Sequence, residues 1–262
     1  MNPVLDEIMH SGYTWSPDGN RVKVDDAISL EEGAFLQKII RDINPIECVD
    51  IGLGYGVSSL FICDALAKTP NASLITIDPK QFSSEKGIGF NNRKERKGIG
   101  LYNLEKAGYQ KMTHFYEAQS HLVLPKLEDQ GVRIDFAFID GWHTFDYTLI
   151  DFFYVDRLLN VGGVVAIHDT NREAIRKVCR FIITNRSYSV FRCSTEQMAF
   201  SNMPIRWVIW RIAQLLPKRV RYLLKPEFTE PDILLGLAPY GSIIAFRKEE
   251  EYMSKSDYHR EF

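Results

Sequence analysis

The sequence lacks a surplus of either charge, a long apolar run and a basic leader. Its 262 residues carry 32 Lys and Arg against 34 Asp and Glu, so no basic excess indicates a nucleic-acid-binding protein. No stretch approaches the roughly 20 apolar residues that a membrane-spanning helix needs. The first residues, MNPVLDEIMHSGY, show no basic segment followed by an apolar one, so no signal peptide is expected.

Cysteine is also sparse, with four residues and no Cys-x-x-Cys pair. Cys48, Cys63 and Cys179 each lie in an apolar segment and are expected to be reduced thiols in the core, which favours a cytoplasmic location. The chain is 45% hydrophobic and 25% charged, close to the average of globular proteins. This composition excludes disorder and coiled coil as descriptions of the whole chain.

Segments typical of strands and helices alternate through the middle of the sequence. Apolar runs predict strands at 47–51, 73–77, 113–116, 134–139 and 164–167. Helices are predicted at 30–43, 58–67, 102–107, 145–159 and 173–184, and a capping box of Ser29 and Glu32 begins the first. Two later strands, 189–192 and 242–246, are expected to be antiparallel. The pattern predicts an α/β fold with a doubly wound, mostly parallel seven-stranded sheet and helices on both faces.

Acidic residues end four of the predicted strands. Asp50, Asp78 and Asp140 end three of them, and the pair His168-Asp169 ends a fourth. Ligands of doubly wound folds bind beyond the carboxyl ends of the strands. These acids therefore indicate a ligand-binding site at the carboxyl ends of the strands.

A glycine-rich loop follows the first of these strands. Gly52, Gly54 and Gly56 lie between the strand and the next helix, where glycine lets a ligand approach the backbone closely. The dinucleotide fingerprint Gly-x-Gly-x-x-Gly requires glycine at position 57, and this chain has Val57. The loop therefore favours a ligand less dependent on phosphate contacts.

Asp50 followed by Gly52, Gly54 and Gly56 resembles the first motif of the class I S-adenosylmethionine-dependent methyltransferases. The resemblance extends from about residue 28 to 172. Segments 28–33 and 138–143, and Gly162-Gly163 followed by His168-Asp169, are similar to a bacterial small-molecule subgroup, methyltransferase family 24. The fold it implies is the Rossmann-like methyltransferase fold.

The resemblance implies S-adenosylmethionine as the cofactor. The loop would surround its methionine part, and Asp78 would accept hydrogen bonds from the ribose hydroxyls, as a carboxylate can. The family often has Gly-Asp-Ala or Gly-Asp-Ser near the adenine, whereas this chain has Ala118-Gln119-Ser120, which leaves the adenine contacts open. The expected cofactor-binding residues are Asp50, Gly52, Gly54, Tyr55, Gly56, Ser58, Asp78, Gln119, Ser120 and Asp140.

The predicted catalytic cluster is Asp140, His143, His168 and Asp169, on two strands expected to be adjacent. His143 could act directly as general base on an acceptor hydroxyl, with Asp140 beside it. Alternatively, carboxylates could hold Mg²⁺ or another divalent cation that acidifies the hydroxyl. Asp140-Gly141-Trp142-His143 is similar to the metal-dependent catechol-type O-methyltransferases, which implies Asp140, Asp169 and Thr170 as ligands, although that family has Asn where this chain has Thr170.

The predicted function is O-methylation of a hydroxyl on a small molecule, such as a sugar or a natural product. Carboxylates and histidine suit hydroxyl activation, and the N-methylation signature Asn/Asp-Pro-Pro is absent after the strand that ends at Ile139. Two alternatives stay open: an NAD(P)-dependent oxidoreductase, and a non-catalytic cofactor-binding module attached to a membrane. The expected partner is the small-molecule acceptor.

Three regions are predicted along the chain: an N-terminal extension (1–27), the methyltransferase domain (28–248) with a helical insertion at about 200–230, and a polar tail (249–262). The segment 197–226 has no acid and six cations interleaved with apolar residues. It is compatible with a membrane-surface contact, with a lid or homodimer surface, or with plain packing against the sheet.

Overall fold

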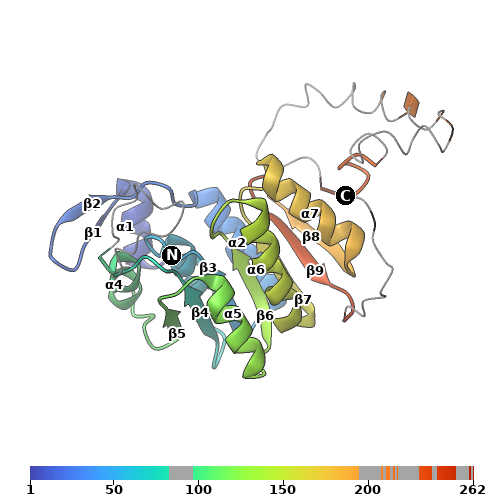
Figure 1. Ribbon diagram of the computed structural model, residues 1–262. Coiled ribbons are helices and arrows are strands. Elements are labelled where there is room, and N and C mark those ends of the chain that lie inside the picture. The colour runs from blue at the N-terminus through green and yellow to red at the C-terminus, as the bar shows by residue number, and fades with distance from the viewer. Residues whose placement is uncertain are drawn as a thin grey trace.

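A seven-stranded sheet forms the centre of the protein (Figure 1). The computed structural model describes residues 1–82, 97–194, 230–237 and 241–251 and positions 208, 211, 212, 215, 217, 260 and 262. The strands of the sheet are β3 (Glu47–Ile51), β4 (Ser73–Ile77), β5 (Thr113–Tyr116), β6 (Ile134–Ile139), β7 (Leu159–Ile167), β8 (Tyr188–Cys193) and β9 (Ile244–Lys248). Their spatial order is β5-β4-β3-β6-β7-β9-β8.

The strands β3 to β7 are paired in parallel, whereas β9 is antiparallel to both β7 and β8. The predicted architecture and the antiparallel late strands are therefore confirmed. The helices are α1 (Pro3–Ser11), α2 (Leu30–Ile43), α3 (Val57–Leu66), α4 (Ile99–Lys106), α5 (Ser120–Asp129), α6 (Phe145–Leu158) and α7 (Glu173–Asn185). Helices α5, α6 and α7 cover one face of the sheet, and α1, α2 and α3 pack on the other.

Alternation along the strands divides the core into two layers. In β3, Val49 and Ile51 pack with α5, α6 and α7, while Cys48 packs with α2 and α3. Successive side chains of a strand point to opposite faces, so a strand covered on both sides is apolar throughout. Because both layers are closed by helices, the ligand-accessible surface is left at the strand ends.

Three elements were not predicted from the sequence: α1, α5, and the hairpin of β1 (Tyr13–Trp15) and β2 (Arg21–Lys23). Helix α5 contains Pro125, a residue that normally argues against a helix interior. Helix α1 did carry signals, because Asn2 caps its first turn and Gly12 ends it with φ 69°.

The N-terminal extension predicted at 1–27 contributes to the core, since Leu5 and Ile8 are buried in the layer of α2 and α3. Most of the predicted insertion at about 200–230 and most of the predicted tail at 249–262 lie outside the described residues. Within the described part of the chain, no helix combines the length and the apolarity needed to cross a membrane.

The strand order determines where a ligand can bind. Strands β4 and β5 extend to one side of β3, and β6 and β7 extend to the other. The chain therefore reverses direction across the sheet between β3 and β6, and a crevice opens where loops leave in opposite directions. The carboxyl ends of β3, β4, β6 and β7 all border this edge, which places the predicted acids around one crevice.

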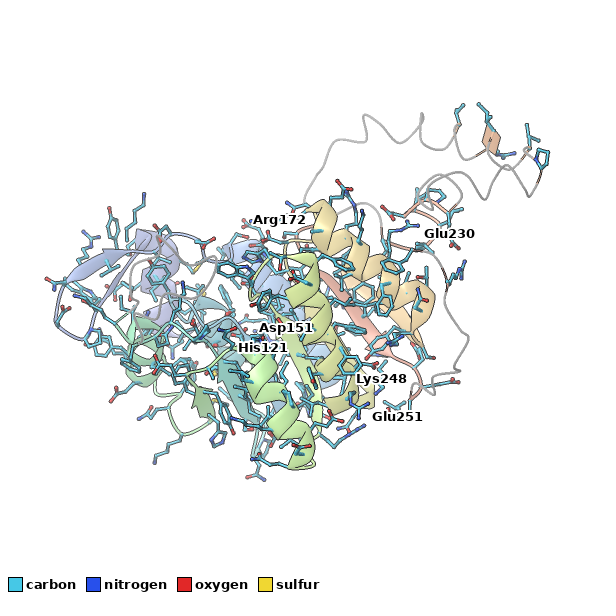
Figure 2. The ribbon with its side chains drawn as sticks, in the orientation of Figure 1. His121, Asp151, Arg172, Glu230, Lys248 and Glu251 are labelled. Carbon is cyan, nitrogen blue, oxygen red and sulfur yellow. The ribbon has the colours of Figure 1, made fainter. Side chains whose placement is uncertain are left out.

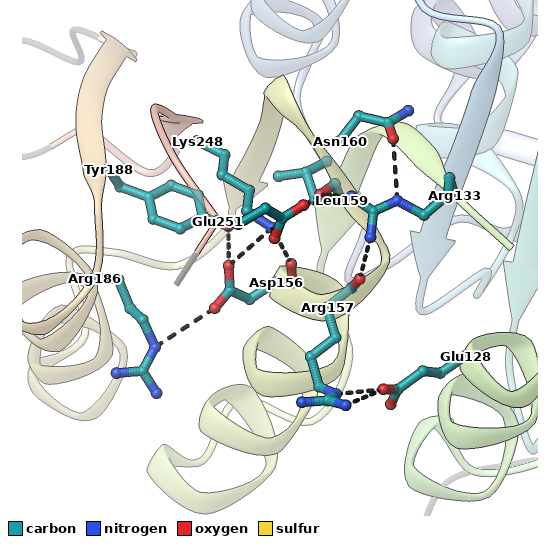
Figure 3. A network of polar contacts seen from close by, with 10 residues as sticks. All are labelled: Glu128, Arg133, Asp156, Arg157, Leu159, Asn160, Arg186, Tyr188, Lys248 and Glu251. Atoms are coloured by element: carbon teal, nitrogen blue, oxygen red, sulfur yellow. Dashed lines mark hydrogen bonds and ion pairs between the residues drawn. The ribbon is translucent and has the colours of Figure 1, made fainter. Parts of the chain in front are cut away.

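A polar network closes the opposite edge (Figure 3). The ammonium of Lys248, 1% exposed, donates to the carbonyl oxygens of Asp156 at 2.7 Å and Leu159 at 3.0 Å, and to Glu251 at 2.7 Å. The Asp156 carboxylate also accepts from the Tyr188 hydroxyl at 2.7 Å. The lysine therefore satisfies the carbonyls at the end of α6 and joins β9 to that helix.

We predict that Lys248→Met destabilises the fold. The substitution leaves two buried carbonyls and a buried carboxylate with fewer partners, a loss of about 2–4 kcal/mol. Urea unfolding followed by circular dichroism measures it. Lys126→Met, at an exposed position of α5, is the control and should change stability by less than about 0.5 kcal/mol. Equal midpoints for the two variants would show that the buried ammonium contributes nothing.

Candidate functional site

The glycine loop lies against the end of β6. Gly52 has φ +106°, and a Cβ at this position would lie 2.3 Å from the carbonyl oxygen of Asp140. Gly54 and Gly56 also have positive φ, 53° and 82°. A side chain at Gly52 is therefore excluded both by its backbone conformation and by the close approach of β6. This contact brings the loop and Asp140 to the same crevice.

The amide groups of the loop glycines are bonded within the protein. Gly52 N–H donates to Ile77, Gly56 N–H donates to Leu53, and Gly54 N–H donates to the Asp78 carboxylate at 2.7 Å. A loop that cradles a diphosphate must present free N–H groups to the phosphate oxygens. The glycines of this loop present none, which agrees with the prediction that the ligand does not depend on phosphate contacts.

Asp78 follows β4 and lines the pocket, and one of its carboxylate oxygens accepts fewer hydrogen bonds than the other. Its Oδ2 accepts from Gly54 N–H and from the Gln81 amide at 3.1 Å, whereas its Oδ1 accepts only from Lys80 N–H, at 2.8 Å, among the described residues. A carboxylate has about four acceptor positions. Oδ1 can therefore accept a further hydrogen bond from a ligand hydroxyl.

One pocket collects most of the predicted site residues. The residues that line it include Gly52, Gly54, Tyr55, Ser58, Asp78, Gln119, Ser120, Asp140, His143, His168 and Asp169. Other lining residues are Asp26, Ala27, Ile28, Lys80, Trp142, Tyr147 and Arg172. Asp50 and Gly56 do not line it, and their contact with the cofactor stays a prediction. Gly56 instead begins α3 and packs against Gly100.

Asp50 supports the loop from beneath. Its side chain is fully buried and accepts hydrogen bonds from Ser58 at 2.8 Å and Ser59 at 2.6 Å, both in the first turn of α3. Burial raises the pKa of Asp50 to about 7 despite these hydrogen bonds. The acid of the glycine motif therefore fixes the start of α3.

A histidine joined to two carboxylates forms one wall of the pocket. His168 Nδ1 lies 2.7 Å from Asp140 Oδ1, and its Nε2 lies 3.1 Å from Glu32 Oε1. Burial opposes protonation, but the hydrogen bonds with Asp140 and Glu32 prevail and raise the pKa of His168 to about 10. The imidazole is therefore a fixed cation near neutral pH, and it cannot accept a proton there.

The second histidine has a different environment. His143 Nδ1 lies 3.1 Å from Asp169 Oδ2, and Arg172 Nε lies 2.9 Å from the same oxygen. Asp169 has φ 57°, a conformation that costs a non-glycine residue on the order of 1 kcal/mol. Figure 2 shows Arg172 near the upper ends of α6 and α7, well above Lys248 and Glu251 in this view. If Nδ1 carries the proton and donates it to Asp169, Nε2 keeps the lone pair that a base needs.

The predicted metal ligands do not assemble into one set. Thr170 is fully buried, donates to the carbonyl of Gly241 at 2.6 Å and does not line the pocket, so its role as a metal ligand stays a prediction. Asp140 is bonded to His168, and Asp169 to His143 and Arg172. Among the residues that the structure describes, no three His, Cys, Asp or Glu side chains group so as to hold a metal ion. We therefore derive no step through a metal.

Comparison with known proteins finds similarities to the middle of the chain. A family model described as "Methyltransferase domain" matches residues 49–170, the segment that contains the loop, Asp78, Asp140 and Asp169. Residues 49–170 are therefore similar to a methyltransferase domain. Curated relatives agree: a putative caffeoyl-CoA O-methyltransferase of Arabidopsis thaliana is 26% identical over 55% of this chain and 54% of its own length. The caffeoyl-CoA O-methyltransferase of Pinus taeda is 30% identical over 54% and 49%.

The chain thus spans about half the length of the curated relatives that it matches. Solved methyltransferases share the fold over more of the chain. An O-methyltransferase from Bacillus cereus in complex with SAH has a TM-score of 0.56 at 16% identity, covering 72% of this chain and 83% of that one. A Podospora anserina methyltransferase bound to SAH has a TM-score of 0.52 at 14% identity, covering 95% and 89%. These likenesses confirm the predicted Rossmann-like methyltransferase fold.

Two features of the site were missed from the sequence: the bond of Glu32 to His168, and the wall of the pocket formed by residues 26–28. Glu32 was predicted only as a helix cap, and it does bond Ser29 N–H at 2.6 Å, but its other oxygen bonds His168. Residues 26–28 form a wall of the pocket although they precede the predicted helix or lie in the predicted extension. The capping box indicated that Glu32 lies in the first turn of a helix. Nothing in the sequence pattern indicated that its side chain would reach His168.

We predict that His168 makes stability fall as pH rises. Because its pKa rises from 6.5 to about 10 on folding, its contribution is complete below pH 6.5 and is lost as pH approaches 10. Between pH 6.5 and 9 the free energy of unfolding should fall by on the order of 1–3 kcal/mol more in the wild type than in His168→Gln. Urea unfolding at each pH measures this difference, and parallel curves for the two proteins would contradict it.

Proposed function

We propose that this protein is an S-adenosylmethionine-dependent O-methyltransferase acting on a hydroxyl of a small molecule. One observation supports this most directly: a single pocket holds the glycine loop and Asp78 on one side and His143 with Asp169 on the other. The residues proposed to bind the methyl donor and those proposed to act on the acceptor therefore border the same pocket. Relatives named as O-methyltransferases support the same reaction class.

The residues present fit the cofactor. Gly52 and Gly54 line the pocket with backbone alone, and Asp78 Oδ1 has acceptor capacity for a ribose hydroxyl. Gln119 and Ser120 line the region predicted for the adenine. S-adenosylmethionine would supply an electrophilic methyl group on its sulfonium. The protein's part is to align the acceptor with that group and to remove its proton.

His143 is the residue we assign to proton removal. It lines the pocket, and Asp169 holds its Nδ1, so that Nε2 can accept the proton of an acceptor hydroxyl. His168 is unsuited to this role because it is already protonated. Asp140 lies between the loop and His168 and would help orient the acceptor and offset the positive charge in the site. Alignment of the acceptor should account for much of the rate.

Activation of the hydroxyl by a divalent cation is the competing proposal. Asp140 and Asp169 would be its ligands, but their oxygens already bond cationic or hydrogen-donating side chains, which supports direct base catalysis instead. The acceptor is proposed as a sugar or natural-product hydroxyl. Caffeoyl-CoA is the first compound to test because it appears in the names of the relatives. We further propose that the protein acts in the cytoplasm, that it binds no nucleic acid and that it can form a homodimer.

The cofactor assignment predicts selective binding. Calorimetric titration should show binding of S-adenosylhomocysteine and none of NADH, because the amides of Gly52, Gly54 and Gly56 are bonded within the protein and are not free to hold a diphosphate. Asp78→Asn should weaken S-adenosylhomocysteine binding by about tenfold or more, since a charged acceptor of the ribose hydroxyls is lost. Asp129→Asn, at an exposed position, is the control. Binding of NADH alone would reject the methyltransferase proposal in favour of an oxidoreductase.

If His143 is the general base, its substitution should reduce turnover without weakening cofactor binding. His143→Gln should lower methyl transfer by about a hundredfold or more, as expected when a general base is removed. Its affinity for S-adenosylhomocysteine should stay within about threefold of wild type. Transfer of a radiolabelled methyl group to caffeoyl-CoA and to a panel of hydroxylated small molecules measures turnover. His114→Gln, an exposed histidine, is the control, and unchanged turnover in His143→Gln would remove the assigned role.

A further inference from the structure

Gln81 is a buried residue beside the pocket that no sequence motif indicated. It lies three positions after Asp78, its side chain is 0% exposed, and it does not line the pocket. A buried amide needs partners for both its donors and its acceptor, because an unsatisfied polar group is costly in the interior. The partners of Gln81 therefore show what this side chain does.

The amide of Gln81 joins three parts of the protein. Its Nε2 donates to the carbonyl of Gly54 at 2.8 Å and to Asp78 Oδ2 at 3.1 Å. Its Oε1 accepts from Gly100 N–H, in the first turn of α4, at 3.1 Å. Only an amide, with a double donor at one end and an acceptor at the other, satisfies this set.

These contacts act on the two groups that the cofactor needs. Gly54 N–H donates to the same Asp78 oxygen that Gln81 bonds, so the amide completes a closed ring of Gly54, Asp78 and Gln81. With Oδ2 held by two donors, the orientation of the carboxylate is fixed, and Oδ1 keeps more acceptor capacity than Oδ2. Rotation of Asp78 would break both bonds.

Close packing limits how the loop can respond if the amide is lost. A Cβ at Gly100 would lie 2.7 Å from the carbonyl oxygen of Gly54 and 3.1 Å from Gln81 Oε1. The start of α4 therefore presses on the loop at the point where Gln81 bonds it. Gly54 has φ 53°, so its peptide orientation is held by these contacts as well as by the chain.

We propose that Gln81 is a positioning residue that holds the Gly54 carbonyl and the Asp78 carboxylate in the arrangement required for the cofactor before the cofactor binds. The inference rests on the proposed function, in which Asp78 bonds the ribose of S-adenosylmethionine. A group oriented in advance adds affinity because binding need not order it. Gln81 acts through Asp78 and Gly54 and does not itself touch the cofactor.

The first test uses the ligand-free protein. Gln81→Met has similar length and no hydrogen-bonding group, so the ring opens and Gly54 loses its carbonyl partner. Hydrogen–deuterium exchange of a peptide covering residues 52–56 should be faster than in wild type by about fivefold or more. Gln130→Glu, at the exposed end of α5, is the control and should exchange like wild type. Unchanged exchange at 52–56 in Gln81→Met would overturn the proposal.

The second test measures coupling to Asp78. Gln81→Glu keeps the shape but directs an anion at Asp78 and at the Gly54 carbonyl, so S-adenosylhomocysteine should bind about tenfold more weakly or worse. In an Asp78→Asn background the repulsion between the two carboxylates is absent. Gln81→Glu should then weaken S-adenosylhomocysteine binding by less than about threefold. Equal losses in both backgrounds would show a merely structural role and overturn the proposal.

Folding and the cofactor assignment are checked separately. Circular dichroism and thermal melting confirm that each variant is folded, and Gln81→Glu serves if Gln81→Met is not. If wild type fails to bind S-adenosylhomocysteine, the proposed function is rejected and the inference with it. If wild type binds and the variants neither lose affinity nor exchange faster at 52–56, only the inference about Gln81 is rejected.

Discussion

The site depends on the contact between Gly52 and the carbonyl of Asp140. A Cβ at position 52 would lie 2.3 Å from that oxygen, so the two chain segments can meet only where glycine is present. The contact joins the end of β3, which leads into the glycine loop, to the end of β6, which leads to His143. Because of it, the residues expected to bind the cofactor and those expected to act on the acceptor border one pocket rather than two separate surfaces.

Charge pairing then gives the ionisable residues around the pocket different roles. Glu32 and Asp140 hold His168 as a cation, while Asp169 pairs with His143 and Arg172. Four carboxylates around a crevice would repel one another if they were unpaired, and each is instead stabilised by a donor: Asp78 by backbone and amide groups, the others by histidine or arginine. The pairing leaves His143 as the histidine suited to exchange a proton, and it leaves few carboxylate oxygens for a metal ion.

Supporting residues outside the pocket make this arrangement rigid. Asp50 bonds two serines at the start of α3, Gln81 bonds the loop and Asp78, and Glu32 both caps α2 and bonds His168. Each is buried, and each connects a strand end to the helix that follows or faces it. The network around Lys248 does the same at the opposite edge, where it fixes β9 to the end of α6. The shape of the pocket is therefore fixed in part by side chains that do not line it.

The amino-acid sequence by itself determined the layers, the glycine loop and the acids at the strand ends. These features follow from local rules: apolar runs form buried strands, glycine permits positive φ, and polar residues begin where a buried strand ends. It also placed Asp140 and Asp169 on neighbouring strands. What it could not decide is which way a buried polar side chain turns, because hydrogen-bond partners far apart in sequence determine that. Thr170 bonds the carbonyl of residue 241, Asp50 bonds α3, and Glu32 reaches a histidine 136 positions away. Only the tertiary structure brings such partners within 3 Å or so of one another, where unsatisfied burial is costly enough to select one orientation.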